Sequence, residues 1–158
     1  MDDTAIKFQE RKDWDRKTPC LPFGWRSLIL MERYLAEGHE VGVHSTVHTD
    51  LTKLDPEQLH QDMGGTTEKI QQAVGIRPVL MRPPGGAYDD AVLREAEEEG
   101  LSVVLWSVDP RDWATHDASA VLKTMARKTG SGDIILMHDL SSSSVTAALR
   151  LVDQLQQE

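Results

Sequence analysis

The sequence predicts an α/β fold in which short parallel strands alternate with helices. Apolar strand-like segments alternate with helix-like segments from about residue 25 onward, which is the pattern of repeated βα units. The strand-like segments are continuously apolar, as in a parallel sheet that is covered by helices. Polar residues also follow four of these segments directly, at the edge where α/β proteins carry their sites.

The helices are expected from apolar periodicity and from residues that favour helix ends. Asp55 is a good N-cap ahead of Pro56 at the first helical position, although Gly64 and Gly65 weaken the middle of that helix. Another helix has Asp89 or Asp90 near its start. The expected helices span residues 25–37, 56–74, 88–99, 118–128 and 143–156.

The expected strands are short runs of apolar and β-branched residues. The run at 101–108 is the clearest buried strand, because it is long and almost continuously apolar. All four expected strands are followed by a polar group. The expected strands span residues 40–44, 79–82, 101–108 and 134–137.

Composition limits the function classes. The chain has 158 residues, which suits one domain, and its net charge of -9 without a basic stripe makes nucleic acid an unsuitable partner. No apolar window is long enough for a transmembrane helix, and the charged first twelve residues resemble no signal peptide. Cys20 is the single cysteine, which excludes an intrachain disulfide framework and a thiolate metal cluster.

His44 and His48 lie four residues apart around the end of the first expected strand. Two imidazoles at this spacing can reach one cation if the chain turns helically between them. Zinc accepts imidazole nitrogen and, in catalytic sites, keeps a position for water. The alternative is one core histidine and one surface histidine.

Arg82 precedes two prolines and two glycines, which together favour a sharp, rigid turn. An arginine held by such a turn can bind a carboxylate, and a backbone N–H in the turn can face an oxyanion. The alternative is an ordinary turn with a surface Arg–Asp pair.

Asp112 and Trp113 follow the third expected strand, and His138 follows the fourth. The aromatic face of Trp113 suits a sugar site, although a tryptophan that covers the rim of the fold gives the same pattern. A histidine at the end of a buried strand can act as general acid or base. The alternative for His138 is a core histidine with its hydrogen bonds satisfied, and Asp109 is interpreted as a turn residue because Pro110 follows it.

Together these groups resemble the polysaccharide deacetylase family, also called the NodB homology domain or carbohydrate esterase family 4. The resemblance extends from about residue 28 to about residue 155, and the motifs follow in the family's order. The matching motifs are His44-Ser45-Thr46-Val47-His48, Arg82-Pro83-Pro84-Gly85-Gly86, Asp109-Pro110-Arg111-Asp112-Trp113 and Ile134-Ile135-Leu136-Met137-His138-Asp139.

The resemblance implies a distorted (β/α) barrel, open on one side, and a divalent metal, usually zinc. It implies that His44 and His48 ligate this metal and that Arg82 orients the catalytic base. The backbone N–H of Gly85 is expected to face the oxyanion. Many relatives have tyrosine at this position, so the backbone donor is retained here and the aromatic wall is not.

The resemblance also gives roles to residues of the later motifs. His138 is expected to protonate the departing amine, and Asp112 to tune His138. Trp113 and Leu136 are expected to line the pocket for the acetyl methyl group.

One motif of the family has no clear counterpart. The family's first motif, T-F-D-D, supplies the base and the third metal ligand, and Asp2 and Asp3 are candidates for its remnant. We therefore expect a single domain over residues 1–158, which forms an incomplete barrel without the usual first strand or strands and without the last strand.

The resemblance implies a metal-dependent hydrolase that removes acetyl groups from N-acetylated or O-acetylated polysaccharide. The sequence does not distinguish among chitin oligomers, peptidoglycan and xylan as the polysaccharide partner. It also leaves the cellular location undetermined, since relatives often work outside the membrane. Two alternatives stand beside this hypothesis. The first alternative is a catalytically silent remnant or sugar-binding module. The second is an α/β metal-binding scaffold of unrelated function.

Overall fold

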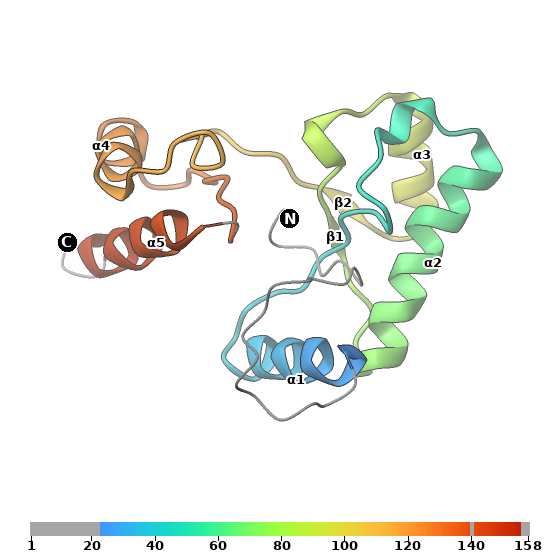
Figure 1. Ribbon diagram of the computed structural model, residues 1–158. Coiled ribbons are helices and arrows are strands. Elements are labelled where there is room, and N and C mark those ends of the chain that lie inside the picture. Colours follow the sequence, from blue (N-terminus) through green and yellow to red (C-terminus); the bar gives the residue numbers. More distant parts are fainter. Residues whose placement is uncertain (1–22, 140, 156–158) are drawn as a thin grey trace. The chain divides into compact units, whose positions relative to one another are not determined.

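The computed structural model of the chain describes residues 23–139 and 141–155 (Figure 1). These residues form two compact units, an N-terminal unit that ends at Val104 and a C-terminal unit that begins at Leu105. Each unit has its own cluster of buried apolar side chains. The expectations about Asp2, Asp3 and Cys20 lie outside the described residues.

The N-terminal unit contains two consecutive crossovers between short parallel segments. β1 pairs in parallel with β2, and Val43 forms a parallel bridge with Met81 of β1, so that β1 lies in the middle. α2 connects Val43 to β1, and α3 connects β1 to β2. The elements of this unit are α1 (Phe23–Ala36), the 3-10 turn Leu51–Lys53, α2 (Pro56–Val74), β1 (Leu80–Met81), the 3-10 turn Pro84–Gly86, α3 (Asp90–Glu98) and β2 (Ser102–Val103).

α2 begins and ends where its sequence signals predict. The Asp55 side chain accepts a hydrogen bond from the Gln58 amide at 2.9 Å, and the Gln58 side chain accepts one from the Asp55 amide at 3.2 Å. This capping box satisfies two amides that the first turn leaves unpaired. Gly75 closes the helix with a φ of 74°, a conformation that glycine adopts without steric cost.

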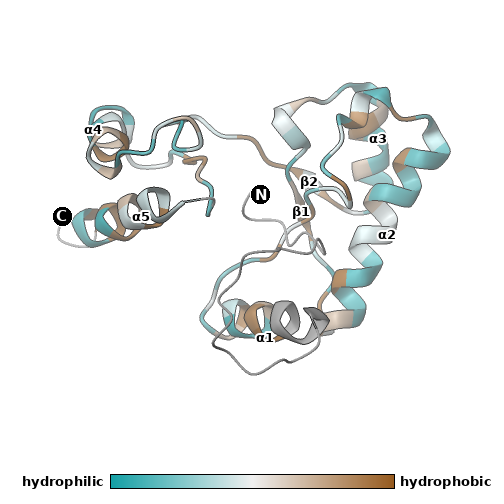
Figure 2. Ribbon diagram, in the orientation of Figure 1, coloured by the Kyte–Doolittle hydropathy of each residue, from teal (hydrophilic) through white to brown (hydrophobic). Residues whose placement is uncertain are grey.

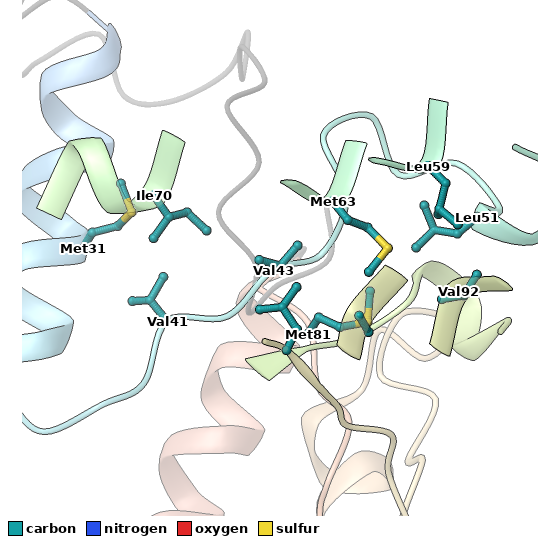
Figure 3. Close-up of a cluster of buried hydrophobic side chains, with 11 residues drawn as sticks. Met31, Val41, Val43, Leu51, Leu59, Met63, Ile70, Met81 and Val92 are labelled. Carbon is teal, nitrogen blue, oxygen red and sulfur yellow. The ribbon is translucent and has the colours of Figure 1, made fainter. Parts of the chain in front are cut away.

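The core of the N-terminal unit joins its helices to the parallel segments (Figure 3). At about 1.5–3 kcal/mol for each fully buried large apolar side chain, this cluster is the main favourable contribution to the unit's folding. The buried members are Met31, Val41, Val43, Leu51, Leu59, Met63, Ile70, Met81, Val92, Ala96 and Leu101.

The C-terminal unit is built on two helices, α4 (Ala118–Lys128) and α5 (Ser142–Leu155), which pack on each other. Both helices carry apolar and polar residues, as expected of amphipathic helices with one buried face (Figure 2). A parallel bridge joins Val108 to Ile135. The buried residues between the helices are Val121, Met125, Ala147 and Leu151.

The α/β class and the parallel pairing are confirmed. All five expected helices are present, and each observed helix end lies within two residues of the expected one. The strands are shorter than expected: β1 and β2 have two residues each, and segments 40–44 and 134–137 contribute bridge residues at Gly42, Val43 and Ile135 within the described part of the chain. One reason is local, because Pro83, which has no backbone N–H, ends the pairing after β1.

No helix in the described ranges has the length and hydropathy of a membrane span.

Candidate functional site

The loop from His44 to His48 follows the bridge residue Val43 and has unusual backbone dihedral angles. Ser45 and His48 have φ angles of 76° and 57°, in the left-handed region that residues other than glycine rarely adopt. Such conformations cost about 1–3 kcal/mol each and persist only when the surroundings enforce them. The result is that the two imidazole rings face each other edge to face, with centroids 5.0 Å apart and planes at 68°.

A carbonyl fixes the orientation of the His44 ring. The Nδ1–H of His44 donates to the backbone oxygen of Arg82 at 2.5 Å, and the Arg82 amide donates to the oxygen of Val43 at 2.9 Å. Because a carbonyl only accepts, the proton is on Nδ1 and the ring lone pair is on Nε2. Metal-binding histidines are commonly held in this way. The pair therefore fits two imidazole ligands of a divalent cation.

Asp62 of α2 holds the loop from the other side, a role that sequence reasoning missed. Its Oδ2 accepts hydrogen bonds from the Ser45 hydroxyl and the Thr46 amide, both at 3.0 Å. The Ser45 hydroxyl in turn accepts from the His48 amide at 3.1 Å. The position of Asp62 between Leu59 and Thr66 on the inward-facing side of α2 is the signal that could have found it.

The Arg82 motif forms the sharp turn that its sequence predicts. Gly85 and Gly86 have φ angles of 63° and 72°, and the Gly86 amide donates to the Pro83 oxygen at 2.9 Å. Only glycine adopts two such conformations in succession without strain. Arg82 is half-buried beside His44, and Gly85 is exposed at the tip of the turn. Their expected roles, orienting a base and facing an oxyanion, remain predictions.

In the C-terminal unit, Asp112 binds His138 with both carboxylate oxygens. Its Oδ1 accepts from Nδ1 of His138 at 2.7 Å, and its Oδ2 accepts from the His138 amide at 2.8 Å. The side chains of Asp112 and His138 are 0% and 8% exposed, so the pair is shielded from water. These bonds fix the orientation of the His138 ring, and the expected tuning of His138 by Asp112 remains a prediction.

The turn before Asp112 directs its carboxylate inward and exposes its neighbour. Asp109 accepts from the Arg111 amide at 2.7 Å, as expected of a turn residue, and Arg111 has a φ of 55°. The guanidinium of Arg111 lies over the ring of Trp113, 5.1 Å from its centroid. Trp113 is 47% exposed.

Leu136 lies in the segment that ends at His138. Its amide donates to the oxygen of Val108 at 2.9 Å, and its side chain is buried. Ile135 and Met137 pack against the α4–α5 core. Because side chains alternate along an extended segment, Leu136 and His138 share the opposite side. A pocket lined by Leu136 remains a prediction.

The eight predicted site residues thus form two groups, one in each unit. The N-terminal unit holds the imidazole pair and the arginine turn, and the C-terminal unit holds the carboxylate–histidine pair and the exposed tryptophan. The first group is His44, His48, Arg82 and Gly85, and the second is Asp112, Trp113, Leu136 and His138.

One further cluster within the described residues brings three candidate metal ligands together, and it does not include His44 or His48. The imidazole of His60 and the carboxylates of Glu95 and Glu99 have ligand atoms within 4.8 Å of one another. The hydrogen bond from His60 to Glu95, 2.8 Å long, raises the pKa of His60. Arg77 also binds Glu99 at 2.6 Å, so this cluster fits an ion-pair network between α2 and α3.

The sequence matches the polysaccharide deacetylase family over residues 26–104, which is half of the chain. A peptidoglycan-N-acetylglucosamine deacetylase of Bacillus cereus is 35% identical over 138 residues, covering 84% of this chain and 64% of the relative. The chain therefore spans just under two thirds of that relative's length.

Solved structures of similar proteins agree with this match. The peptidoglycan deacetylase PdaC of Bacillus subtilis has a TM-score of 0.76 at 32% identity, covering 85% of this chain and 64% of that one. A pseudoenzyme of carbohydrate esterase family 4 from Bacillus anthracis has a TM-score of 0.77 at 25% identity, covering 85% of this chain and 48% of that one.

Proposed function

The chain belongs to the polysaccharide deacetylase family, and from that premise we propose that it is a metal-dependent hydrolase of acetylated polysaccharide. The reaction releases acetate from an N-acetylated sugar by hydrolysis of its amide. The observation that carries the proposal is the His44–His48 pair, in which the Arg82 carbonyl fixes the orientation of the His44 ring beside the His48 ring. The similarity to solved deacetylases further supports the finer proposal of a distorted (β/α) barrel.

The proposed cation is zinc. Imidazole nitrogens suit zinc, and a catalytic zinc site has three protein ligands and one position for water. When bound, such an ion polarises a carbonyl and lowers the pKa of a bound water. Within the described residues, no carboxylate, imidazole or thiolate forms a three-ligand group with His44 and His48. The candidates for a third ligand are Asp2 and Asp3, which lie outside the described residues.

His138 is the proposed general acid. Asp112 accepts the Nδ1 proton and holds the ring in a shielded position, so the proton that leaves must come from Nε2. That proton goes to the sugar nitrogen as its bond to the acetyl carbon breaks. Asp112 stabilises the imidazolium from which the proton is released, as carboxylates do in other catalytic pairs.

The remaining predicted residues bind and orient. The side chain of Arg82 orients the carboxylate base, and the Gly85 amide donates to the developing oxyanion. Leu136 shares the side of its segment with His138, which supports a role beside the acetyl methyl group. Trp113 is exposed, which supports a contact with a sugar ring.

The substrate proposed first is the N-acetylglucosamine polymer of peptidoglycan, because the Bacillus relatives act on peptidoglycan. Chitin oligomers share the same N-acetylglucosamine unit, and acetylated xylan is an ester substrate for comparison. The test is acetate release by the purified chain from each polymer, with zinc added or removed by a chelator. Zinc-dependent release supports the proposal, and the absence of release from a folded sample contradicts it.

A catalytically silent, sugar-binding protein is the second candidate, since one of the similar solved structures is a pseudoenzyme of the family. Retained binding of N-acetylglucosamine oligomers without acetate release would identify this function. Asp2→Asn discriminates further, since it abolishes activity only if Asp2 supplies the base.

A further inference from the structure

Asp62 is a carboxylate in the middle of α2, on the side that faces the core. It is 8% exposed, and its helical neighbours Leu59 and Met63 are 3% and 0% exposed. A carboxylate in such a place is unfavourable unless hydrogen bonds compensate for the lost hydration. Its contacts therefore indicate what it does for the fold.

All the side-chain hydrogen bonds that Asp62 makes within the described residues go to the histidine loop. Its Oδ2 accepts from the Ser45 hydroxyl and from the Thr46 amide, both at 3.0 Å. Its Oδ1 has no hydrogen-bonding partner in that part of the chain. The carboxylate thus acts through a single oxygen, and both of its donors stand between the two histidines.

The hydrogen bonds continue from Asp62 to the backbone of His48. The Ser45 hydroxyl that donates to Asp62 accepts from the Val47 amide at 3.3 Å and from the His48 amide at 3.1 Å. Ser45 and His48 are the two loop residues with positive φ, so this chain of bonds stabilises the strained part of the loop.

The backbone of Asp62 is linked to the same loop. Its carbonyl oxygen accepts from the Thr66 hydroxyl at 2.6 Å, and that hydroxyl shares a hydrogen bond with the Thr46 hydroxyl at 2.7 Å. One turn of α2 therefore holds two consecutive loop residues. A loop braced from one helix has a fixed position relative to the core.

We propose that Asp62 is a positioning residue that sets the geometry of the His44–His48 pair for its metal. The inference rests on the proposed function and adds a residue that the family motifs do not contain. Asp62 acts through Ser45 and the loop backbone, without touching the metal or the substrate. A fixed pair of ligands binds metal more tightly than a mobile pair, because less conformational entropy is lost on binding.

The test compares four variants of the full chain for zinc affinity, measured by calorimetry with zinc alone. Loss of a residue that orients metal ligands weakens metal binding about 10–100-fold, and we expect this of Asp62→Ala. Asp62→Asn keeps an oxygen acceptor but loses the charge that strengthens its hydrogen bonds, so its loss is smaller. Ser45→Ala breaks the same chain of bonds, and combining it with Asp62→Ala adds little further loss.

The matched control is Thr67→Val. Thr67 is also buried on α2, but its hydroxyl donates to the Met63 oxygen at 2.9 Å within the helix. This variant therefore lowers stability without touching the loop, and its zinc affinity should equal that of the wild type. An equal loss of affinity in Thr67→Val and Asp62→Ala would attribute the effect to general destabilisation and overturn the proposal.

A second readout does not depend on zinc. The exchange rate of the His48 amide with solvent, measured by NMR on the metal-free chain, should rise in Asp62→Ala and stay unchanged in Thr67→Val. If the wild type binds no zinc, the proposed function fails, and this exchange rate alone decides whether Asp62 holds the loop. If Asp62→Ala fails to fold, a faster rate in Asp62→Asn supports the proposal. Wild-type zinc affinity and exchange in the folded Asp62 variants would overturn it.

Discussion

The two histidine groups of this chain are held in different ways. His48 stands on a loop with positive φ angles, and the hydrogen bonds that shape this loop run through Ser45 to a buried helix residue. His138 follows a bridged segment, and one carboxylate, that of Asp112, binds both its ring and its amide. The first arrangement fixes the positions of two proposed ligands, and the second fixes the orientation of the proposed general acid.

This difference suits two kinds of chemistry. A metal site needs ligand atoms at defined positions, so its loop requires support over several residues. A general acid needs a defined tautomer and shielding from water, which one buried carboxylate can provide. The two groups should therefore respond differently to substitution.

The largest effect is expected from His48→Ala. Removing one of two described imidazole ligands should abolish measurable zinc binding and with it all acetate release, because the remaining ligands hold the ion too weakly. Calorimetric zinc titration and an acetate assay check this result. His39→Ala, which replaces an exposed histidine nearby, is the control and should retain both properties. Wild-type zinc affinity in His48→Ala would remove the metal site from this loop.

The next largest effect is expected from His138→Ala. Loss of a general acid lowers kcat by about 10²–10⁴-fold, while zinc affinity should remain that of the wild type. Steady-state kinetics at saturating zinc, together with zinc titration, separate the two properties. Asp112→Asn should lower kcat in the same direction, because an amide accepts the Nδ1 proton less strongly. Unchanged kcat in His138→Ala would contradict its role.

A smaller effect concerns the two cores. Met63 and Met125 are both 0% exposed, one in each unit, and truncating a buried methionine to alanine costs about 2–5 kcal/mol. Hydrogen exchange resolved by segment should show Met63→Ala lowering protection in α2, and Met125→Ala lowering it in α4 and α5. Equal loss of protection in both units from either variant would mean that the units unfold together and would contradict this prediction.

The smallest effect concerns His60 on α2. Its hydrogen bond and charge interaction with Glu95 raise its pKa above the usual value of 6.5. The resulting stabilisation is fully present below about pH 6.5 and is lost as pH rises through the higher folded pKa. Thermal unfolding should therefore show His60→Gln to be more destabilising at pH 5.5 than at pH 9. The difference should shrink when Glu95→Gln is already present, and an equal effect at both pH values would contradict the interaction.

Much of the fold could be predicted because its signals are local. Asp55 and Pro56 lie at the start of the helix that they delimit, and the observed start of α2 agrees with them. Strand lengths could not be predicted in this way, since pairing depends on distant partners. The apolar run 101–108 pairs through β2 and Val104 in one unit and through Val108 in the other.

Part of the candidate site could also be predicted from local sequence patterns. Residues within the four motifs, such as His44 and His138, could be proposed because their motifs are contiguous in sequence, and their roles remain predictions. Asp62 was missed because a single aspartate in a helix usually lies in solvent, and only the fold brings it within 3.0 Å of Ser45. The contribution of the Arg82 carbonyl was also missed, because a backbone oxygen leaves no mark in the sequence.

The central claim is that the His44–His48 loop provides the metal ligands and His138 the proton in one deacetylation reaction. The most direct test is the rate of acetate release from N-acetylglucosamine oligomers as a function of zinc concentration, for the wild type, Asp62→Ala and His138→Ala. The account predicts that Asp62→Ala shifts the curve to higher zinc, while His138→Ala lowers its plateau without a shift. A His138→Ala curve that is shifted with an unchanged plateau, or a wild-type rate independent of zinc, would contradict it.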